Sequence, residues 1–217
     1  MWLTADRPYA NRREAGKELA ARLAEFAGRH DVVVLALPRG GVPVAAEIAD
    51  ALPAPLDIFL VRKLGLPGNS ELAMGAIASG GVRVLNDDVV RMYGVPDRTI
   101  DEVAREESAE LARREREYRQ GRALVDVSGR VVILVDDGLA TGSTMKAAVA
   151  ALRQLGPARL VVAAPVGSPS TCEDLRALAD EVVCARTPAN FSAVGEWYDD
   201  FSQTTDEEVR QLLTARL

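Results

Sequence analysis

The chain has 217 residues, a formal net charge of −6 and an isoelectric point near 5.0. An acidic balance of this size argues against general nucleic-acid binding, although local arginines and Mg²⁺ can still hold a polyphosphate. With 48% hydrophobic residues the chain can fill a core, and its length favours a single domain over residues 1–217. The single histidine, His30, excludes a His-rich metal site.

No apolar run approaches the ~20 residues that a membrane-spanning helix needs. Charged residues near the N-terminus interrupt any signal peptide. We therefore expect a cytoplasmic protein with no membrane partner. Two cysteines are too few for a disulfide framework, so Cys172 and Cys184 are expected to be reduced thiols.

The first predicted elements are a helix over residues 12–27 and a β-branched strand over residues 32–37. For the helix we expect only a scaffold role, unless it shields a face of the sheet. The strand runs into Arg39 and two glycines, and a helix follows. Ligands in open α/β sheets collect at the carboxyl ends of strands, so Arg39 is placed to meet an anion. The alternative is a simple turn with a solvent-exposed arginine.

A third strand is predicted over residues 56–61 and leads into Arg62 and Lys63. Two cations at a strand end again indicate an anion site, although such a pair is commonly just a solvated strand end. Residues 64–70 are rich in glycine and proline, which is typical of a mobile loop that closes over a ligand. Residues 71–78 are expected to return from that loop into the sheet.

A hairpin turn is predicted at residues 80–81, between strands over 76–78 and 82–85. A long charged helix follows over approximately residues 98–120. Its glutamates and arginines alternate at the i, i+4 spacing of a solvated helix face. The alternative is that this helix contacts a second subunit.

The most informative stretch begins with a five-residue apolar strand over residues 131–135, which is followed by Asp136 and Asp137. Glycines and hydroxyl residues over 138–144 then lead into a helix. Such a turn offers backbone N–H groups and the positive end of a helix dipole to a phosphate. The two carboxylates suit vicinal ribose hydroxyls. The lysine of a P-loop and the Gly-x-Gly-x-x-Gly fingerprint are absent, and the plain alternative is a capped turn.

Further strands are predicted over residues 159–164 and 181–185, and a terminal helix over 205–216. Aromatic residues gather in residues 188–201 of a chain that is only 5% aromatic. Such a cluster can pack a lid or stack on a planar base. Core packing is the alternative.

The stretch over residues 131–144 closely resembles the phosphoribosyl-pyrophosphate (PRPP) motif of the type I phosphoribosyltransferases. The chain is similar to a bacterial branch of that family, outside its named purine and pyrimidine members. The resemblance implies an α/β fold with a central, mainly parallel sheet flanked by helices. It also implies a small hood subdomain with flexible elements at approximately residues 64–85 and 186–204.

By this resemblance Asp136 and Asp137 bind the ribose hydroxyls. The resemblance assigns the 5-phosphate to one loop: Ala140, Thr141, Gly142, Ser143 and Thr144. Many members of the family carry an aspartate in place of Ala140, where it is proposed to act as a base. The alanine leaves the loop intact and the general base open.

The resemblance assigns the pyrophosphate to a second set of residues: Arg39, Gly40, Gly41, Arg62 and Lys63. A non-proline cis peptide is implied between Pro38 and Arg39. Phe191 and Val194 fit the base-binding positions, and Asp199 fits a metal-binding position. Otherwise Mg²⁺ is held through PRPP and water.

The implied activity is Mg²⁺-dependent transfer of the 5-phosphoribosyl group of PRPP to a nitrogenous base or related amine, with release of pyrophosphate. Asp137, Arg39 and Lys63 are the candidate catalytic residues, and a homodimer is expected. Two alternatives stay open. One is a non-catalytic regulator that binds PRPP or a nucleotide, and the other is a hydrolase of PRPP or nucleotides. The sequence does not name the acceptor.

Overall fold

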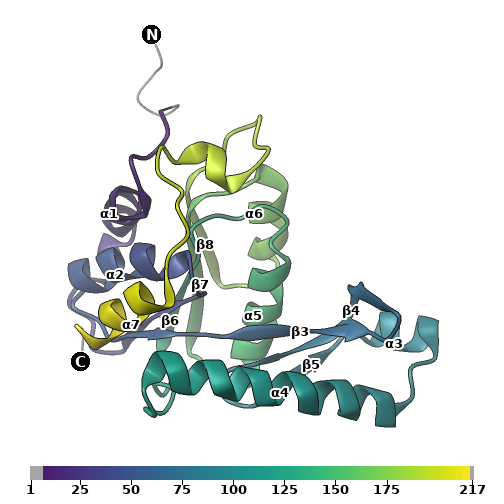
Figure 1. Cartoon of the computed structure of the whole chain (residues 1–217). Helices are drawn as coiled ribbons and strands as arrows, with labels where there is room; N and C mark the ends of the chain where they lie inside the picture. The colour runs from purple at the N-terminus through teal and green to yellow at the C-terminus, as the bar shows by residue number, and fades with distance from the viewer. Residues whose placement is uncertain (1–6, 216–217) are drawn as a thin grey trace.

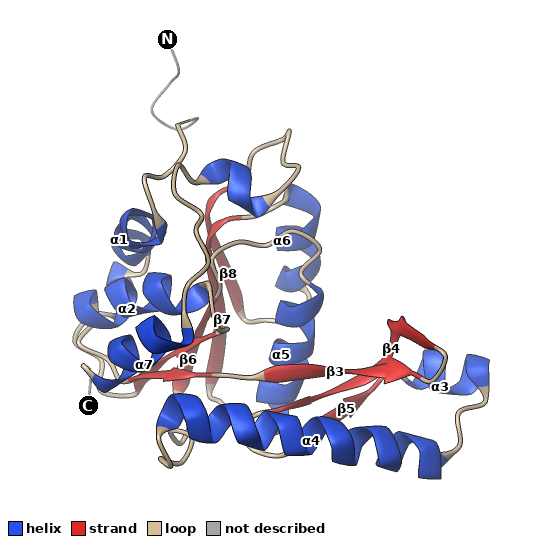
Figure 2. Ribbon diagram, viewed as in Figure 1, coloured by secondary structure: helices blue, strands red, loops and turns tan. Residues whose placement is uncertain are grey.

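The computed structural model describes residues 7–215 and has a parallel sheet with helices on both faces (Figures 1 and 2). The five strands of this sheet lie in the order β2-β1-β6-β7-β8, and every neighbouring pair is parallel. Their bounds are β1 Val32–Ala36, β2 Leu56–Ile58, β6 Val131–Val135, β7 Arg159–Val166 and β8 Glu181–Arg186. The predicted mainly parallel α/β architecture is confirmed.

The two central strands are apolar at every position because helices cover both sides of them. Every residue of β1 and β6 is buried. Along β1 the side chains alternate, so that Val34 enters the core beneath one helical layer and Val33 the core beneath the other. One layer contains α1 Arg12–Arg22, α2 Gly41–Ala51 and α7 Asp206–Thr214, and the other α5 Ser143–Gln154 and α6 Pro169–Arg176.

A second, antiparallel sheet extends from one end of the molecule in the order β3-β4-β5 (Figure 1). Its strands are β3 Val61–Leu66, β4 Asn69–Ala78 and β5 Val82–Leu85. Two helices accompany it, α3 Asp87–Tyr93 and α4 Asp97–Arg119. The hairpin expected at residues 80–81 and the long charged helix are confirmed.

Two predictions about the second sheet were wrong. The strand expected over residues 56–61 breaks after Ile58, where the chain leaves the parallel sheet and starts β3 at Val61. The loop expected over residues 64–70 is instead largely a β-hairpin, in which Pro67 and Gly68 form a two-residue turn. Gly68 has φ +82°, as the glycine of a Pro-Gly type II turn does.

The other boundaries differ from the predictions by a few residues. The first helix ends at Arg22 and a short 3₁₀ helix, Ala24–Phe26, completes the predicted span. A second 3₁₀ helix covers Val194–Trp197. The terminal helix ends at Thr214, and the last residue predicted for it lies outside the described part of the chain. Within the described residues, we find no helix with both the length and the apolarity to cross a membrane.

A buried ion pair connects helix α4, which accompanies the second sheet, to strand β2 of the first sheet. Arg119, at the end of α4, lies 2.9 Å from Asp57 of β2, and its side chain is only 3% exposed. Its Nη2 atom also donates to the carbonyl of Ile58, and the backbone N–H of Val125 donates to Asp57. A buried charge needs partners of this kind, so the site is satisfied rather than strained.

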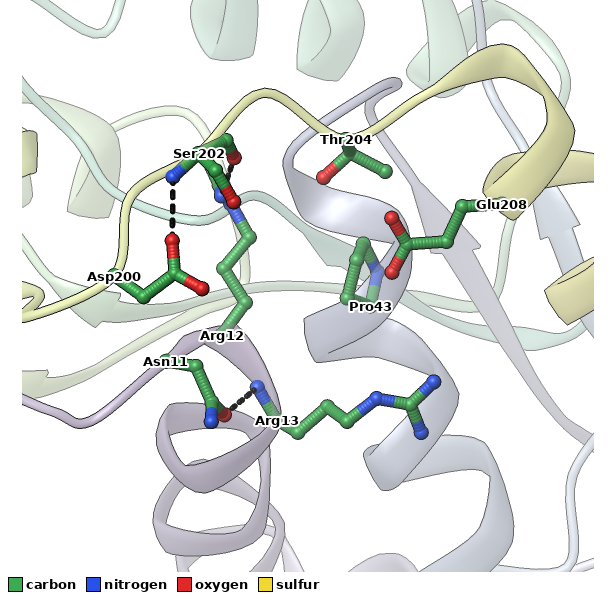
Figure 3. A pocket seen from close by; sticks show the side chains of 8 residues that line it. All are labelled: Asn11, Arg12, Arg13, Pro43, Asp200, Ser202, Thr204 and Glu208. Carbon is green, nitrogen blue, oxygen red and sulfur yellow. Dashed lines mark hydrogen bonds between the residues drawn. The ribbon is translucent and has the colours of Figure 1, made fainter.

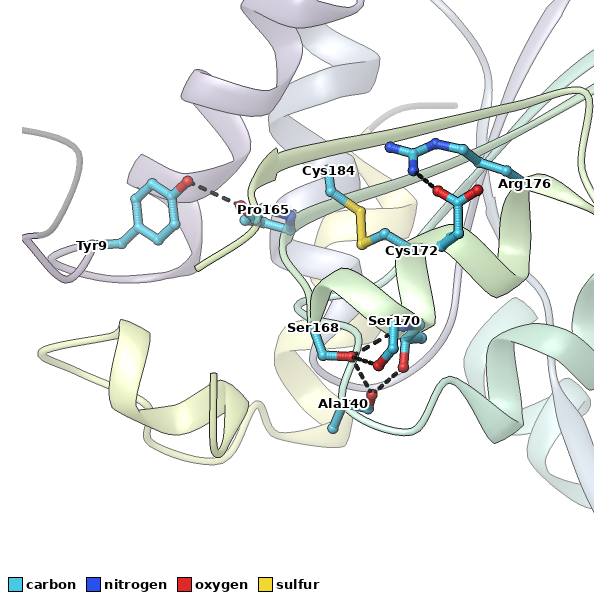
Figure 4. The surroundings of a disulfide bond; sticks show 10 residues. Tyr9, Ala140, Pro165, Ser168, Ser170, Cys172, Arg176 and Cys184 are labelled. Atoms are coloured by element: carbon cyan, nitrogen blue, oxygen red, sulfur yellow. Dashed lines mark hydrogen bonds and ion pairs between the residues drawn. A yellow bond between two sulfur atoms is a disulfide. The ribbon is translucent and has the colours of Figure 1, made fainter. Parts of the chain in front are cut away.

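The expectation of reduced cysteines was wrong in this structure. Cys172 of α6 and Cys184 of β8 form a disulfide (Figure 4). Helix α6 precedes β8 and packs against it, which places the two side chains opposite each other. The count of cysteines could not indicate this, because it depends on how a helix lies on a strand.

Candidate functional site

Two acidic residues end the central strand β6, as the sequence predicted. The backbone N–H of Asp137 donates to Oδ1 of Asp136 at 2.9 Å. Burial, followed by the neighbouring charge of Asp137, raises the pKa of Asp136 well above its usual range. Asp136 therefore holds a proton more tightly than an ordinary aspartate does.

The turn that follows leads directly into helix α5. Gly142 is the N-cap of α5 and has φ +68°, a conformation that glycine adopts without steric cost. Thr141, Ser143 and Thr144 are exposed, and the hydroxyls of Thr141 and Ser143 lie 3.2 Å apart. An exposed turn with hydroxyls at the positive end of a 12-residue helix is suited to a phosphate.

The N-terminal end of helix α6 contacts this turn, which the sequence had not indicated. Thr171 Oγ1 donates to the carbonyl of Ala140 at 2.5 Å. Ser168 Oγ donates to the same oxygen at 3.3 Å (Figure 4). A Cβ on Gly142 would lie 2.5 Å from the Thr171 methyl group. The local signal for Ser168 was its role as N-cap before Pro169, but no local signal marks Thr171.

The loop after β1 lies against the acidic pair. The peptide bond between Pro38 and Arg39 is cis, as the resemblance implied. A Cβ on Gly40 would lie 2.0 Å from Oδ2 of Asp137, and one on Gly41 would lie 2.7 Å from the carbonyl oxygen of Val135. Only glycines permit this approach, so the two predicted loops form one site.

Arg39 and the start of helix α7 are neighbours. The guanidinium of Arg39 lies 3.7 Å from the carboxylate of Asp206, and its side chain is 33% exposed. The hydroxyl of Tyr118 donates to the same carboxylate at 2.6 Å. Arg39 is therefore at the predicted loop and partly open to solvent, with an acidic partner from the C-terminal helix.

Arg62 and Lys63 do not end a parallel strand, because both lie within β3. Successive side chains of a strand point to opposite faces, so the two cannot share one pocket. Arg62 forms an ion pair with Glu107 of α4. Lys63 is exposed and lies on the opposite face, shared with Val61, which packs against the core beneath α5. The structure therefore separates the two predicted cations, with Arg62 directed toward α4.

The C-terminal segment over residues 186–204 covers the site together with the N-terminal segment. The carbonyl of Tyr9 accepts from the Asp199 N–H at 2.7 Å, and the Tyr9 N–H donates to the carbonyl of Trp197 at 2.8 Å. Figure 1 shows the short helix Val194–Trp197 of this segment at the top of the view, away from the β3–β5 sheet. Residues 9 and 10, for which we expected only irregular structure, are its partner.

The three residues predicted in this segment have different surroundings. A Cβ on Gly138 would lie 2.4 Å from Val194 Cγ1, so Val194 touches the turn after the acidic pair. Phe191 packs in a small cluster that contains Tyr9 and Tyr198. The side chain of Asp199 is exposed. Within residues 7–215 no group of three or more acidic, histidine or cysteine side chains is arranged to hold a metal.

Two residues of the site were missed in the sequence. The hydroxyl of Tyr198 donates to the backbone carbonyl of Asp137 at 2.6 Å. Arg12 Nε lies 2.8 Å from Oδ2 of Asp137. An arginine at the start of a helix opposes the helix dipole, and this local inconsistency is the signal that could have marked Arg12. Helix α1 thus has more than the scaffold role we expected.

Phosphate-accepting turns after two adjacent parallel strands are typical of α/β proteins that bind phosphorylated ligands. The family model described as a phosphoribosyl transferase domain matches residues 9–200. The chain therefore belongs to the phosphoribosyltransferase family.

A protein of Mycobacterium tuberculosis (strain ATCC 25618 / H37Rv), named provisionally as a phosphoribosyl transferase, is 50% identical over 201 residues. The match covers 93% of this chain and 45% of that protein, so the chain spans about half the length of the curated relative. The crystal structure of TT1426 from Thermus thermophilus has a TM-score of 0.86 and 45% identity, covering 96% of this chain and 98% of that chain. A purine phosphoribosyltransferase from Pyrococcus horikoshii matches with a TM-score of 0.45 and 19% identity, covering 81% and 82%.

Proposed function

We propose that this chain transfers the 5-phosphoribosyl group of PRPP to a nitrogenous base or related amine and releases pyrophosphate. The observation that supports this most is the contact between the two loops. The carboxylate of Asp137 lies against Gly40, with the phosphate turn continuing from the same strand. One ligand with a phosphate, a diol and a pyrophosphate would span these three places.

In this proposal the ligand is held by complementary groups along its length. Asp136 and Asp137 accept hydrogen bonds from the ribose hydroxyls. The 5-phosphate sits on residues 140–144, where exposed hydroxyls and the N-terminus of α5 meet it. The pyrophosphate lies along residues 39–41, and Lys63 is the further candidate cation for it. Holding the reactant this way removes much of the entropic cost of reaching the transition state.

Mg²⁺ fits this site as an ion that arrives with the substrate. The described residues offer two adjacent carboxylates rather than a cage of ligands. Mg²⁺ is commonly bound by one or two carboxylates together with substrate phosphates and water. When bound, it would neutralise charge on the departing pyrophosphate. Asp136 and Asp137 would face it through the ribose hydroxyls, and Asp199 is the further candidate from the C-terminal segment.

The chemical step depends more on electrostatic stabilisation of developing charge by the chain than on a protein nucleophile. Breaking the bond from C1 to the pyrophosphate leaves positive charge on the ribose and negative charge on the leaving group. Asp137 would stabilise the first, and Arg39 and Lys63 the second. Val194 touches the turn beside Asp137 and, with Phe191, would border the acceptor. Ala140 supplies no base, so the acceptor would bring its own reactive nitrogen.

A regulator that binds PRPP without turnover is the second candidate. One observation favours it: Arg62 is paired with Glu107 of α4 and leaves the pyrophosphate with fewer cations. A hydrolase of PRPP or nucleotides is the third candidate and rests on the absence of a base at Ala140. A homodimer belongs to the proposal through the family resemblance alone, and a cytoplasmic location through the sequence features that led us to expect it.

Calorimetric titration with PRPP, with and without Mg²⁺, tests the proposal first. Release of pyrophosphate is then measured against a panel of nucleobases and simple amines. Mg²⁺-dependent binding with release for one acceptor supports the transferase and names its acceptor. Binding without release points to the regulator, and release without any acceptor points to the hydrolase. No binding at all contradicts the proposal.

A further inference from the structure

The carboxylate of Asp137 is held by an arginine from the other end of the chain. Arg12 is the first residue of α1, and its Nε lies 2.8 Å from Asp137 Oδ2. The side chains are 11% and 15% exposed. Water therefore screens this pair far less than an exposed ion pair, and its charge-assisted hydrogen bond is of the stronger kind.

The C-terminal segment holds Arg12 in place. Its Nη1 atom donates to the carbonyl of Ser202 at 2.8 Å, and its guanidinium carbon lies 4.1 Å from the centre of the Phe201 ring. Figure 3 shows Arg12 running from the start of α1 toward Ser202, beside a cavity, while Arg13 leaves the helix in another direction. Three contacts on one guanidinium leave it little freedom to turn away from Asp137.

The contacts of Asp137 restrict the orientation of its carboxylate. Tyr198 fixes its backbone carbonyl, Arg12 holds Oδ2, and the close approach of Gly40 limits the other side. Arg12 also places a positive charge beside two adjacent acidic groups, which would otherwise repel each other.

We infer that Arg12 is a positioning residue for PRPP binding: it holds the carboxylate of Asp137 in place for the ribose hydroxyls. This inference rests on the proposed function, because it concerns the same ligand. The inference adds to the site a residue outside the phosphate and pyrophosphate loops. It also means that the contact between the N-terminal and C-terminal segments helps to position Asp137.

Helix α1 does not depend on Arg12 for its place in the fold. Leu19 and Leu23 are fully buried beneath it, and Asn11 caps its N-terminus by accepting from the N–H groups of Arg13 and Glu14. An Arg12 variant should therefore fold. Its effect on PRPP can then be measured apart from any effect on stability, which thermal unfolding would report.

The test compares PRPP affinity in Arg12→Ala, Arg12→Lys and Arg13→Ala. Arg13 is the matched control, since it lies next along the helix, pairs with Glu47 at 3.5 Å and is 54% exposed. We expect Arg12→Ala to weaken PRPP binding about 10- to 100-fold, the loss of a charge-assisted hydrogen bond. Arg12→Lys should recover part of it, because the charge remains without the fork of donors. Arg13→Ala should bind normally.

A double-mutant cycle with Asp137→Asn separates positioning from a general structural effect. If Arg12 acts through Asp137, adding Arg12→Ala to Asp137→Asn should change PRPP affinity by no more than about twofold. Equal losses in both backgrounds, or normal binding by Arg12→Ala, would overturn the inference and leave the proposed function standing. Failure of the unaltered protein to bind PRPP would overturn both.

Discussion

Gly40 and Asp137 lie so close that a single methyl group cannot fit between them, since a Cβ on Gly40 would come within 2.0 Å of Oδ2 of Asp137. The contact joins the loops after two adjacent parallel strands, β1 and β6. The site therefore requires glycine at position 40.

Gly40→Ala is therefore expected to displace the carboxylate of Asp137 and to lower PRPP turnover by up to about 100-fold, the effect of a misplacement near 1 Å. Steady-state pyrophosphate release measures this. Gly28→Ala is the control, because its Cβ would meet nothing within 4 Å and only its φ of +75° is unfavourable. The control should lose stability but keep its activity. An active Gly40→Ala variant would contradict the proposed arrangement of the loops.

Thr171 is expected to matter for both stability and the phosphate turn. Thr171→Val keeps the shape but removes the hydrogen bond to the carbonyl of Ala140, which should cost about 1–3 kcal/mol of unfolding free energy. PRPP binding should weaken as well, because the turn loses its support from α6. Thr171→Ser keeps the donor and should retain most of the affinity. Chemical denaturation and calorimetry report the two effects, and equal behaviour of both variants would refute this role.

The raised pKa of Asp136 predicts that the free energy of unfolding depends on pH. Its pKa is raised in the folded protein, so the folded state binds the proton more tightly than the unfolded chain. Its contribution is complete below the ordinary carboxyl range and is lost as the pH rises from there through the raised pKa. The slope reaches at most about 1.4 kcal/mol per pH unit.

Asp136→Asn should remove this decline, so that the variant gains stability relative to the unaltered protein as the pH rises. Denaturant unfolding at a series of pH values measures the difference. Parallel curves for the two proteins over the whole range would show that Asp136 titrates normally and that this prediction is wrong.

The buried pair of Arg119 and Asp57 is expected to stabilise the union of the two sheets. Arg119→Ala leaves the carboxylate of Asp57 without its partner, which should cost about 3–5 kcal/mol. Arg98→Ala on the same helix is the control, since Arg98 is 90% exposed and pairs with Glu102 at the surface. That variant should change stability by less than about 0.5 kcal/mol. Equal losses would contradict the burial argument.

The local parts of the site were predictable because they depend on neighbouring residues. The five apolar residues of β6, the acidic pair and the hydroxyl-rich turn into α5 are consecutive, and the structure places them as expected. The glycines of the other loop, Gly40 and Gly41, follow β1 in the same way. Parallel pairing of the two strands then brings these loops together, since both strands end at one edge.

The positions of Arg62 and Lys63 could not be predicted from neighbouring residues. Their sequence reads as a charged strand end, but the chain leaves the first sheet after Ile58 and places both residues inside an antiparallel strand. Strand geometry then points them to opposite faces. Which sheet a short apolar segment joins depends on its partners, and Arg119 on the distant helix α4 is one of the residues that hold this crossing.

The sequence by itself determined the strand and turn chemistry over residues 131–144, because backbone preference, charge and helix start are local properties. Only the tertiary structure decided that Arg12 meets Asp137, that Tyr198 binds the carbonyl of Asp137, and that Cys172 meets Cys184. Arg12 and Asp137 are 125 positions apart. Contacts of this kind arise from the packing of whole helices and segments, which no local pattern of residues specifies.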